Sequence, residues 1–250
     1  YRLYEILPGL SIWLTLILSL VLSFVRPLWM IYFIIIFSVY WVLKVINFSF
    51  YLLVAWRRYY VSKRTDWKDK LFHEVDNWQD KHHVVFLTLY NEDWAVVKTA
   101  IRSIAKSAYD KSKITIVIAG EERMKLHYED ILQKTKKAFS DSFSDIVGTC
   151  HPSNLKNEIP GKGSNLHYSE RQMKEYIDKK GWEHKNVIAT IFDIDTVCSI
   201  HYFSYLTYLY CTHPRPTHTS FQPIALYNNN MWESPAVLRV MAFGTTFWMF

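Results

Sequence analysis

Apolar residues fill almost all of the first sixty positions, in two runs with a short break between them. The first run covers residues 6–25 and the second covers residues 28–56, with Arg26 and Pro27 in the break. Each run has at least the roughly 20 residues that a helix needs to cross the hydrocarbon core of a bilayer. Because a backbone in lipid must satisfy its own hydrogen bonds, the pattern predicts a transmembrane helical hairpin over residues 1–60.

Lys44 lies inside the second run, where a charge is costly unless it reaches the interface or a partner. We favour an arrangement in which the span ends near Leu43 and residues 44–60 form a helix along the membrane interface. Trp56 and Tyr60 are of the aromatic type that gathers there. The alternative is one long tilted helix that carries Lys44 to a lipid headgroup.

Six basic residues crowd the exit from the second run: Arg57, Arg58, Lys63, Arg64, Lys68 and Lys70. By the positive-inside rule, they predict that this end of the hairpin is cytoplasmic. We therefore expect an integral protein of the plasma or inner membrane. Its remaining part would lie in the cytosol, joined through a charged linker at residues 61–82.

From residue 83 onward, short apolar runs rich in β-forming residues alternate with helical patterns. The predicted strands are residues 84–89, 114–119, 145–150 and 187–192, and the predicted helices are residues 93–107, 121–139 and 164–177. Strands that are apolar along their whole length and alternate with helices predict an α/β domain over residues 83–250. Its sheet should be mostly parallel and covered on both faces.

Composition and charge narrow the class of partner. The 250 residues suffice for one domain with an accessory element, and the net charge of +6 suits a cytoplasmic membrane face or an anionic substrate. No Lys/Arg stripe on a recognisable nucleic-acid-binding fold is evident, so we expect no nucleic-acid partner. Cys150, Cys198 and Cys211 match no zinc or redox spacing and indicate reduced thiols in the cytosol.

Polar residues follow three of the predicted strands, and sheets of this type bind ligands beyond the carboxyl ends of their strands. The three groups are Tyr90-Asn91-Glu92, Gly120-Glu121-Glu122-Arg123 and Asp193-Ile194-Asp195. We expect all three to meet at one edge of the sheet. Asp193 and Asp195 can point to the same side, which suits Mg²⁺ or Mn²⁺ completed by substrate phosphates. An exposed turn with two acids is the alternative explanation.

Two further segments each allow two explanations. Asn91 can cap the helix that follows it, whereas Tyr90 at the same point can stack on a base. Residues 160–166, Pro-Gly-Lys-Gly-Ser-Asn-Leu, permit close backbone approach and offer Lys162 to a phosphate. The segment lacks the spacing of a P-loop, and a flexible basic loop has the same composition.

These features, in this order, resemble the start of a family 2 glycosyltransferase with the GT-A fold, over residues 83–222. Residues 86–92, Phe-Leu-Thr-Leu-Tyr-Asn-Glu, resemble the first strand of the family and its Tyr-Asn-Glu turn. Residues 162–166 are similar to the Lys-x-Gly-Asn-Leu segment of membrane-bound members, and residues 192–195 are similar to the Asp-x-Asp site.

The resemblance implies a metal-dependent, inverting glycosyltransferase that moves a sugar from a nucleotide-sugar donor to a lipid-linked or polysaccharide acceptor. It implies that the donor is held by Tyr90, Asn91, Glu92, Glu121, Lys162 and Asn165. Asp193 and Asp195 would be the catalytic residues that hold the metal and the diphosphate, and Gln222 would lie on the acceptor side.

The chain departs from the family pattern at two places. Ala119-Gly120 stands where the family has an Asp-Asp or Asp-Gly that grips the base, and Glu121 is the expected substitute. No later acidic residue of the general-base motif is evident. We therefore expect the base outside this chain, a glycosyltransferase domain that is incomplete at its C-terminus, and a longer parent membrane protein.

Two other functions fit parts of the pattern. A nucleotidyltransferase has a similar α/β core and would exchange pyrophosphate, although Tyr90-Asn91-Glu92 is not its Gly-rich basic signature. A non-catalytic, membrane-tethered module that binds nucleotide sugars would keep the fold, and Ala119-Gly120 is the best support for it.

Overall fold

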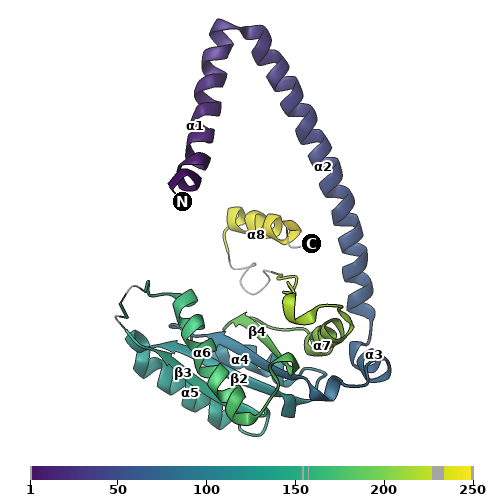
Figure 1. The fold of residues 1–250 in the computed structure, drawn as a ribbon, viewed down its shortest axis with the longest axis vertical. Coiled ribbons are helices and arrows are strands. Elements are labelled where there is room, and N and C mark those ends of the chain that lie inside the picture. The colour runs from purple at the N-terminus through teal and green to yellow at the C-terminus, as the bar shows by residue number, and fades with distance from the viewer. Residues whose placement is uncertain (1, 154, 157, 227–233, 249–250) are drawn as a thin grey trace. The chain divides into compact units, whose positions relative to one another are not determined.

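The structure is a computed structural model that describes residues 2–153, 155–156, 158–226 and 234–248. The chain divides into two compact units, whose elements are labelled in Figure 1. The hairpin unit comprises residues 1–64 and 223–250, and the sheet unit comprises residues 65–222. The sequence pattern assigns residues 223–250 to the domain that starts at residue 83. Their described regular element is an apolar helix, α8 (Ala236–Trp248), which is not part of the four-stranded sheet.

Two long helices form the N-terminal part of the hairpin unit. Helix α1 (Arg2–Val25) and helix α2 (Pro27–Arg64) are separated by Arg26 alone and contact each other. Both are long and apolar enough to cross a membrane, and neither buries a residue against the described part of the chain. The prediction of two long apolar helices is therefore confirmed, and it indicates membrane association.

Helix α2 does not end near Leu43, so the favoured arrangement for Lys44 is wrong at this point. The helix is continuous for 38 residues, and residues 28–64 contain no glycine or proline that would stop it. The Lys44 ammonium group lies 5.5 Å from the centroid of the Tyr40 ring, one helical turn before it. The separate interfacial helix is replaced by one long helix.

The segment predicted as a linker, residues 61–82, is largely folded against the sheet unit. Helix α3 (Trp67–Glu74) begins at Asp66, whose carboxylate accepts hydrogen bonds from two backbone N–H groups of the first turn. Leu71 of α3 and, after the helix has ended, Val75 and Trp78 are buried in the main core. Helix α3 packs on α7 (Tyr202–Thr212).

Four parallel strands form the sheet, in the order β3-β2-β1-β4. They are β1 (His82–Thr88), β2 (Ile114–Glu121), β3 (Asp145–His151) and β4 (Val187–Asp193). Each strand includes one of the predicted apolar runs, except that β1 ends at Thr88, one residue before the end of its run. The prediction of a parallel α/β sheet is confirmed. The register sets Thr88, at the end of β1, beside both Ala119 and Asp193. The carboxyl ends of three strands therefore meet, as the sequence predicts.

Helices cover the two faces of the sheet unequally. Helices α4 (Trp94–Ala105) and α5 (Lys125–Phe139) pack on one face together with α7, and α6 (Lys162–Lys180) packs on the other. Strand β2 is buried along its whole length. Edge strand β4 alternates instead, and Ile191 is 47% exposed. Coverage of both faces is thus confirmed for the central strands and wrong for β4, which helix α6 does not cover.

Short 3₁₀ helices complete the described connections: η1 (Trp78–Asp80), η2 (Lys111–Lys113), η3 (Glu122–Met124), η4 (His184–Asn186) and η5 (Pro216–His218). Helix η3 matters most for the site, because it turns the chain directly after the end of β2.

Candidate functional site

A cavity of about 450 Å³ opens at the carboxyl ends of β1, β2 and β4. Its lining residues come from the three strand ends and from the start of α6: Thr88, Leu89, Tyr90, Glu92, Glu121, Arg123, Gly161, Lys162, Asn165, Asp193, Ile194 and Asp195. Seven of the nine predicted site residues are among them. We call this hollow the strand-end cavity.

Asn91 and Gln222 are the two predicted residues that do not line the cavity. Asn91 does not cap the following helix either, because α4 begins one residue after Asp93, whose own side chain makes no capping hydrogen bond. Gln222 is exposed, and its neighbour Phe221 packs against the cluster formed with α7. The structure therefore gathers the expected donor-side residues except Asn91, and it does not bring the expected acceptor-side residue to them.

The two aspartates follow from the way β4 ends. Asp193 is the last residue of the strand, and its carbonyl accepts a hydrogen bond from Thr196 N–H at 2.9 Å, which turns the chain. Ile194 is 2% exposed and anchors the turn, whereas Asp193 and Asp195 on either side of it are exposed. One buried residue thus holds two carboxylates at the cavity.

Lys162 is the cation that faces these acids. Its ammonium group forms an ion pair with the carboxylate of Asp193. Lys162 is the first residue of the 19-residue helix α6, whose N-terminal amides carry a partial positive charge. The Ser164 hydroxyl secures this start by donating to the carbonyls of Ile159 and Gly161, each at 2.9 Å. The segment is therefore a helix start rather than a flexible basic loop.

Asn165 is a buried residue with unused hydrogen-bonding capacity. It is 1% exposed, and its amide nitrogen donates to the carbonyl of Ala119 at 2.9 Å, which ties α6 to β2. Its Oδ1 atom is buried and has no partner among the described residues. A buried acceptor without a hydrogen bond costs free energy. This oxygen at the cavity wall is therefore suited to accept a hydrogen bond from a ligand.

Arg123 is a charged residue of the cavity lining to which the sequence pattern assigns no role. Its guanidinium group forms an ion pair with Glu121, which is almost fully buried, and it lies 5.1 Å from the centroid of the Tyr90 ring. The hydrogen bond to Glu121 raises the pKa of Arg123 above its ordinary value. The feature of the sequence that could have indicated a role for Arg123 is its place in the polar group after β2. What the sequence could not show is that η3 folds it back over the turn after β1.

The turn after β1 is held by its own side chain. The Glu92 carboxylate accepts a hydrogen bond from the Tyr90 N–H at 2.8 Å. His127 of α5 contacts the carbonyl of Glu92 through Nε2 at 3.1 Å, so the ring donates from that nitrogen. These contacts fix the position of Tyr90, which is 44% exposed beside the cavity.

Gly120 has a packing role in this chain. It stands at the second position of the Asp-Asp or Asp-Gly pair of the family that the sequence resembles. A Cβ atom at Gly120 would lie 2.2 Å from Cδ2 of Tyr128, a buried ring of α5. A side chain at this position would therefore push α5 away from the sheet. Glu121, one residue later, is the acidic side chain that reaches the strand-end cavity.

We expect Gly120→Ala to lower the free energy of unfolding of the sheet unit by about 1–3 kcal/mol, because the Tyr128 ring cannot leave without exposing a core helix. Gly163→Ala is the matched control, since a Cβ atom there meets nothing within 4 Å. Urea unfolding of the full chain in detergent, followed by tryptophan fluorescence, measures both. Equal midpoints for the two variants would contradict this packing role.

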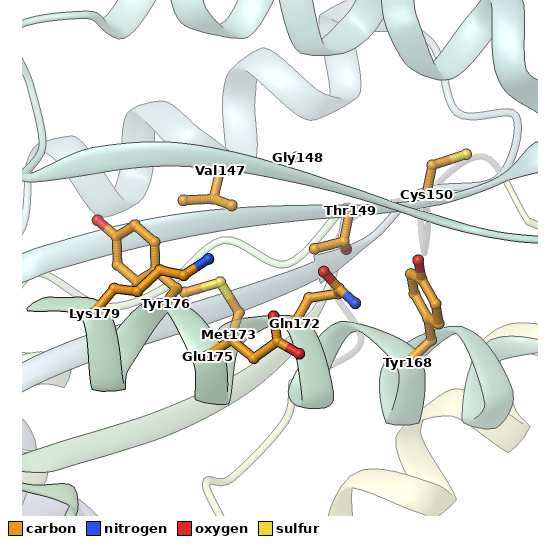
Figure 2. Close-up of a pocket in the computed structure, with 10 residues that line it drawn as sticks. All are labelled: Val147, Gly148, Thr149, Cys150, Tyr168, Gln172, Met173, Glu175, Tyr176 and Lys179. Carbon is orange, nitrogen blue, oxygen red and sulfur yellow. The ribbon is translucent and has the colours of Figure 1, made fainter.

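A second hollow, of about 300 Å³, lies between β3 and α6 at the outer edge of the sheet. Figure 2 shows Tyr176 and Tyr168 toward its two ends, with Gln172 between them and Val147 on the strand. No predicted site residue lines it. The candidate chemistry is therefore gathered at the strand-end cavity.

The strand-end cavity offers hard oxygen ligands to a cation. Asp193 and Asp195 are two carboxylates, but no group of three His, Cys, Asp or Glu side chains that could hold a metal is found in the described part of the chain. Mg²⁺ is commonly bound through one or two carboxylates, with water and ligand oxygens supplying the rest. The donor set fits an ion that arrives with a phosphorylated ligand better than a site made by protein alone.

Comparison with known proteins adds no family assignment. No family model matches the chain, and no curated protein matches it.

Proposed function

We propose that this chain is a membrane-anchored glycosyltransferase of GT-A type. It would bind a nucleotide sugar in the strand-end cavity and transfer the sugar to a lipid-linked or polysaccharide acceptor. One observation carries the proposal: polar residues from three strand ends and the start of α6 line the same cavity. Parallel sheets bind ligands at this edge, and about 450 Å³ lies within the range of small-molecule sites.

Two groups of side chains would hold the two parts of the donor. Tyr90, Glu121 and Arg123 combine an aromatic ring with a charged pair, which suits a base and its ribose. Lys162 and the amides at the start of α6 suit the diphosphate, because an ammonium group and a helix N-terminus both attract phosphate. The unpartnered Oδ1 of Asn165 would accept a hydrogen bond from the nucleotide.

Asp193 and Asp195 would hold Mg²⁺ or Mn²⁺ beside the diphosphate. When bound, the ion would offset the negative charge of the departing nucleoside diphosphate. Lys162 now neutralises Asp193, so an ion at this carboxylate would release the Lys162 ammonium group to the phosphates. Lys162 and the metal ion would therefore compete for one carboxylate.

The hairpin unit supports an acceptor in the membrane. Two helices long enough to cross the bilayer would keep the sheet unit tethered where lipid-linked sugars are found. The basic residues in the last turns of α2 and directly after it support a cytoplasmic sheet unit, where nucleotide sugars are made. Gln222 stays a proposed acceptor-side residue.

A donor panel tests this function. The full chain, reconstituted in lipid nanodiscs with Mn²⁺, is given UDP-, GDP- and ADP-sugars, and released nucleoside diphosphate is measured. We expect release from one nucleotide class, accelerated by a lipid extract that supplies acceptors. Exchange of pyrophosphate into the nucleotide sugar would identify a nucleotidyltransferase instead. Binding without release would identify a non-catalytic module, and the absence of both binding and release would contradict the proposal.

A further inference from the structure

The length of the apolar part of α2 fixes where its charged end would lie in a bilayer. Residues 28–56 are 29 consecutive positions that hold one charged residue, Lys44. At a rise of about 1.5 Å per residue they extend about 43 Å, which matches the roughly 40–45 Å of a bilayer with its headgroups. Arg26 and Arg57 stand directly outside the two ends. If α2 crosses the membrane, Arg57 lies at the outer edge of the headgroups, and Arg64, about 10 Å further along the helix, stays within about one Debye length of them.

Four cations follow within two turns and form what we call the basic girdle: Arg57, Arg58, Lys63 and Arg64. All four side chains are exposed, and none forms an ion pair with another residue that the structure describes. At about 100° per residue, Arg57 and Arg64 share one side of the helix, whereas Arg58 and Lys63 point to two other sides. A helix charged all round passes through a surface, whereas one lying along it is charged on one side.

The sequence between Glu5 and the girdle holds no acidic residue that could neutralise this charge, and the first acid after the girdle is Asp66. The whole of α2 and its turn therefore carry cations only. Aromatic residues accompany the girdle, as is usual at the membrane interface. The Arg64 guanidinium lies 4.1 Å from the centroid of the Tyr60 ring, which holds it beside the helix while its N–H groups stay available.

We propose that the basic girdle binds the phosphate groups of anionic phospholipids, so that this membrane anchor prefers lipids such as phosphatidylglycerol over zwitterionic ones. The charge complementarity is specific to this location, because clusters of Lys and Arg at the end of a transmembrane helix attract anionic headgroups. The inference needs α2 to cross the membrane, but it is independent of any sugar transfer by the sheet unit.

Spin-labelled lipids test the proposal. The full chain is reconstituted in phosphatidylcholine vesicles that contain a trace of spin-labelled phosphatidylglycerol or spin-labelled phosphatidylcholine, and the motionally restricted fraction of each is measured. We expect an association constant for phosphatidylglycerol at least about fivefold higher than for phosphatidylcholine, since each basic residue near the surface contributes about that factor. The preference should weaken at high salt. It should persist when inorganic phosphate is added in large excess over the labelled lipid, because a site for free anions would then be emptied of lipid.

The decisive variant carries Arg57→Gln, Arg58→Gln, Lys63→Gln and Arg64→Gln, and its preference should fall to about onefold. The control removes four exposed cations of the sheet unit instead, through Lys106→Gln, Lys136→Gln, Lys137→Gln and Lys174→Gln, and should keep the full preference. A charge-preserving variant with lysine in place of Arg57, Arg58 and Arg64 should also keep it. Flotation of the vesicles checks that each variant is inserted.

A wild-type chain with no preference for phosphatidylglycerol would overturn the proposal. So would a preference that survives in the girdle variant, or one that disappears equally in the control. Displacement of the lipid by inorganic phosphate would point to a free-anion site and would also overturn it.

Discussion

We expect the double replacement of Asp193 and Asp195 by asparagine to lower metal-dependent turnover of the nucleotide sugar by about a thousandfold or more. The carboxylates would hold the ion that offsets charge on the departing diphosphate, and metal ions of this kind contribute several kcal/mol to the transition state. Asparagine keeps the size of each side chain but removes its negative charge. The measurement is release of nucleoside diphosphate by the chain in nanodiscs, with and without Mn²⁺.

The matched control is Asp141→Asn, because Asp141 is an exposed carboxylate outside the cavity lining. It should leave turnover unchanged. Both acids lie in a turn anchored by buried Ile194, so the urea midpoint of the double variant should stay near that of the wild type. A folded double variant that still turns over at the wild-type rate with Mn²⁺ would exclude this pair as the metal site.

Replacing Lys162 by methionine should change two affinities in opposite directions. The nucleotide sugar should bind about 10- to 100-fold more weakly, because a charge-assisted hydrogen bond to phosphate contributes about 1.5–3 kcal/mol. Mn²⁺ alone should bind more tightly, because the ammonium group that occupies the Asp193 carboxylate is gone. Calorimetric titration with each ligand separately measures both effects.

Lys174→Met provides the control for this variant, since Lys174 is an exposed lysine on the same helix and outside the cavity. Neither affinity should change in it. Lys162→Arg should restore much of the nucleotide-sugar affinity while still competing with Mn²⁺. If Lys162→Met weakened both ligands together, the competition for Asp193 would be refuted and a general loss of local structure would explain the result.

The parallel sheet could be predicted from the sequence because its central strands are apolar on both faces. Val84 and Phe86 face α6, whereas Val85 and Leu87 face the opposite layer. The apolar residues of β1 alone therefore indicate that both faces of the sheet are covered. The same rule failed for β4, because an apolar run does not show whether a helix will cover it. Ile191 is apolar in sequence and 47% exposed in the structure.

The candidate site could be predicted to the extent that it follows from strand ends. Tyr90, Glu121 and Asp193 come directly after or at the end of apolar runs, and parallel strands bring such ends together. Arg123 could not be assigned, because its position depends on a single turn of 3₁₀ helix. The packing of Gly120 against Tyr128 was equally hidden, because eight residues separate the two in the sequence and only the fold brings them into contact.

In the hairpin, the sequence pattern predicted the end of a helix wrongly. A lysine within an apolar run suggested that the span stops, yet helix continuity depends on backbone hydrogen bonds and on the absence of glycine and proline. Residues 65–82 looked like a linker because they are charged. Three buried side chains, Leu71, Val75 and Trp78, are enough to fold this segment against the core.

The central claim is that the strand-end cavity binds a nucleotide sugar together with a divalent ion. The most direct test is calorimetric titration of the unmodified full chain with UDP- and GDP-sugars, in the presence of Mn²⁺ and again with a chelator. We expect saturable binding of one nucleotide class that weakens at least about tenfold when the ion is removed. No binding of either class with Mn²⁺ present, or binding of equal strength with the chelator, would contradict the claim.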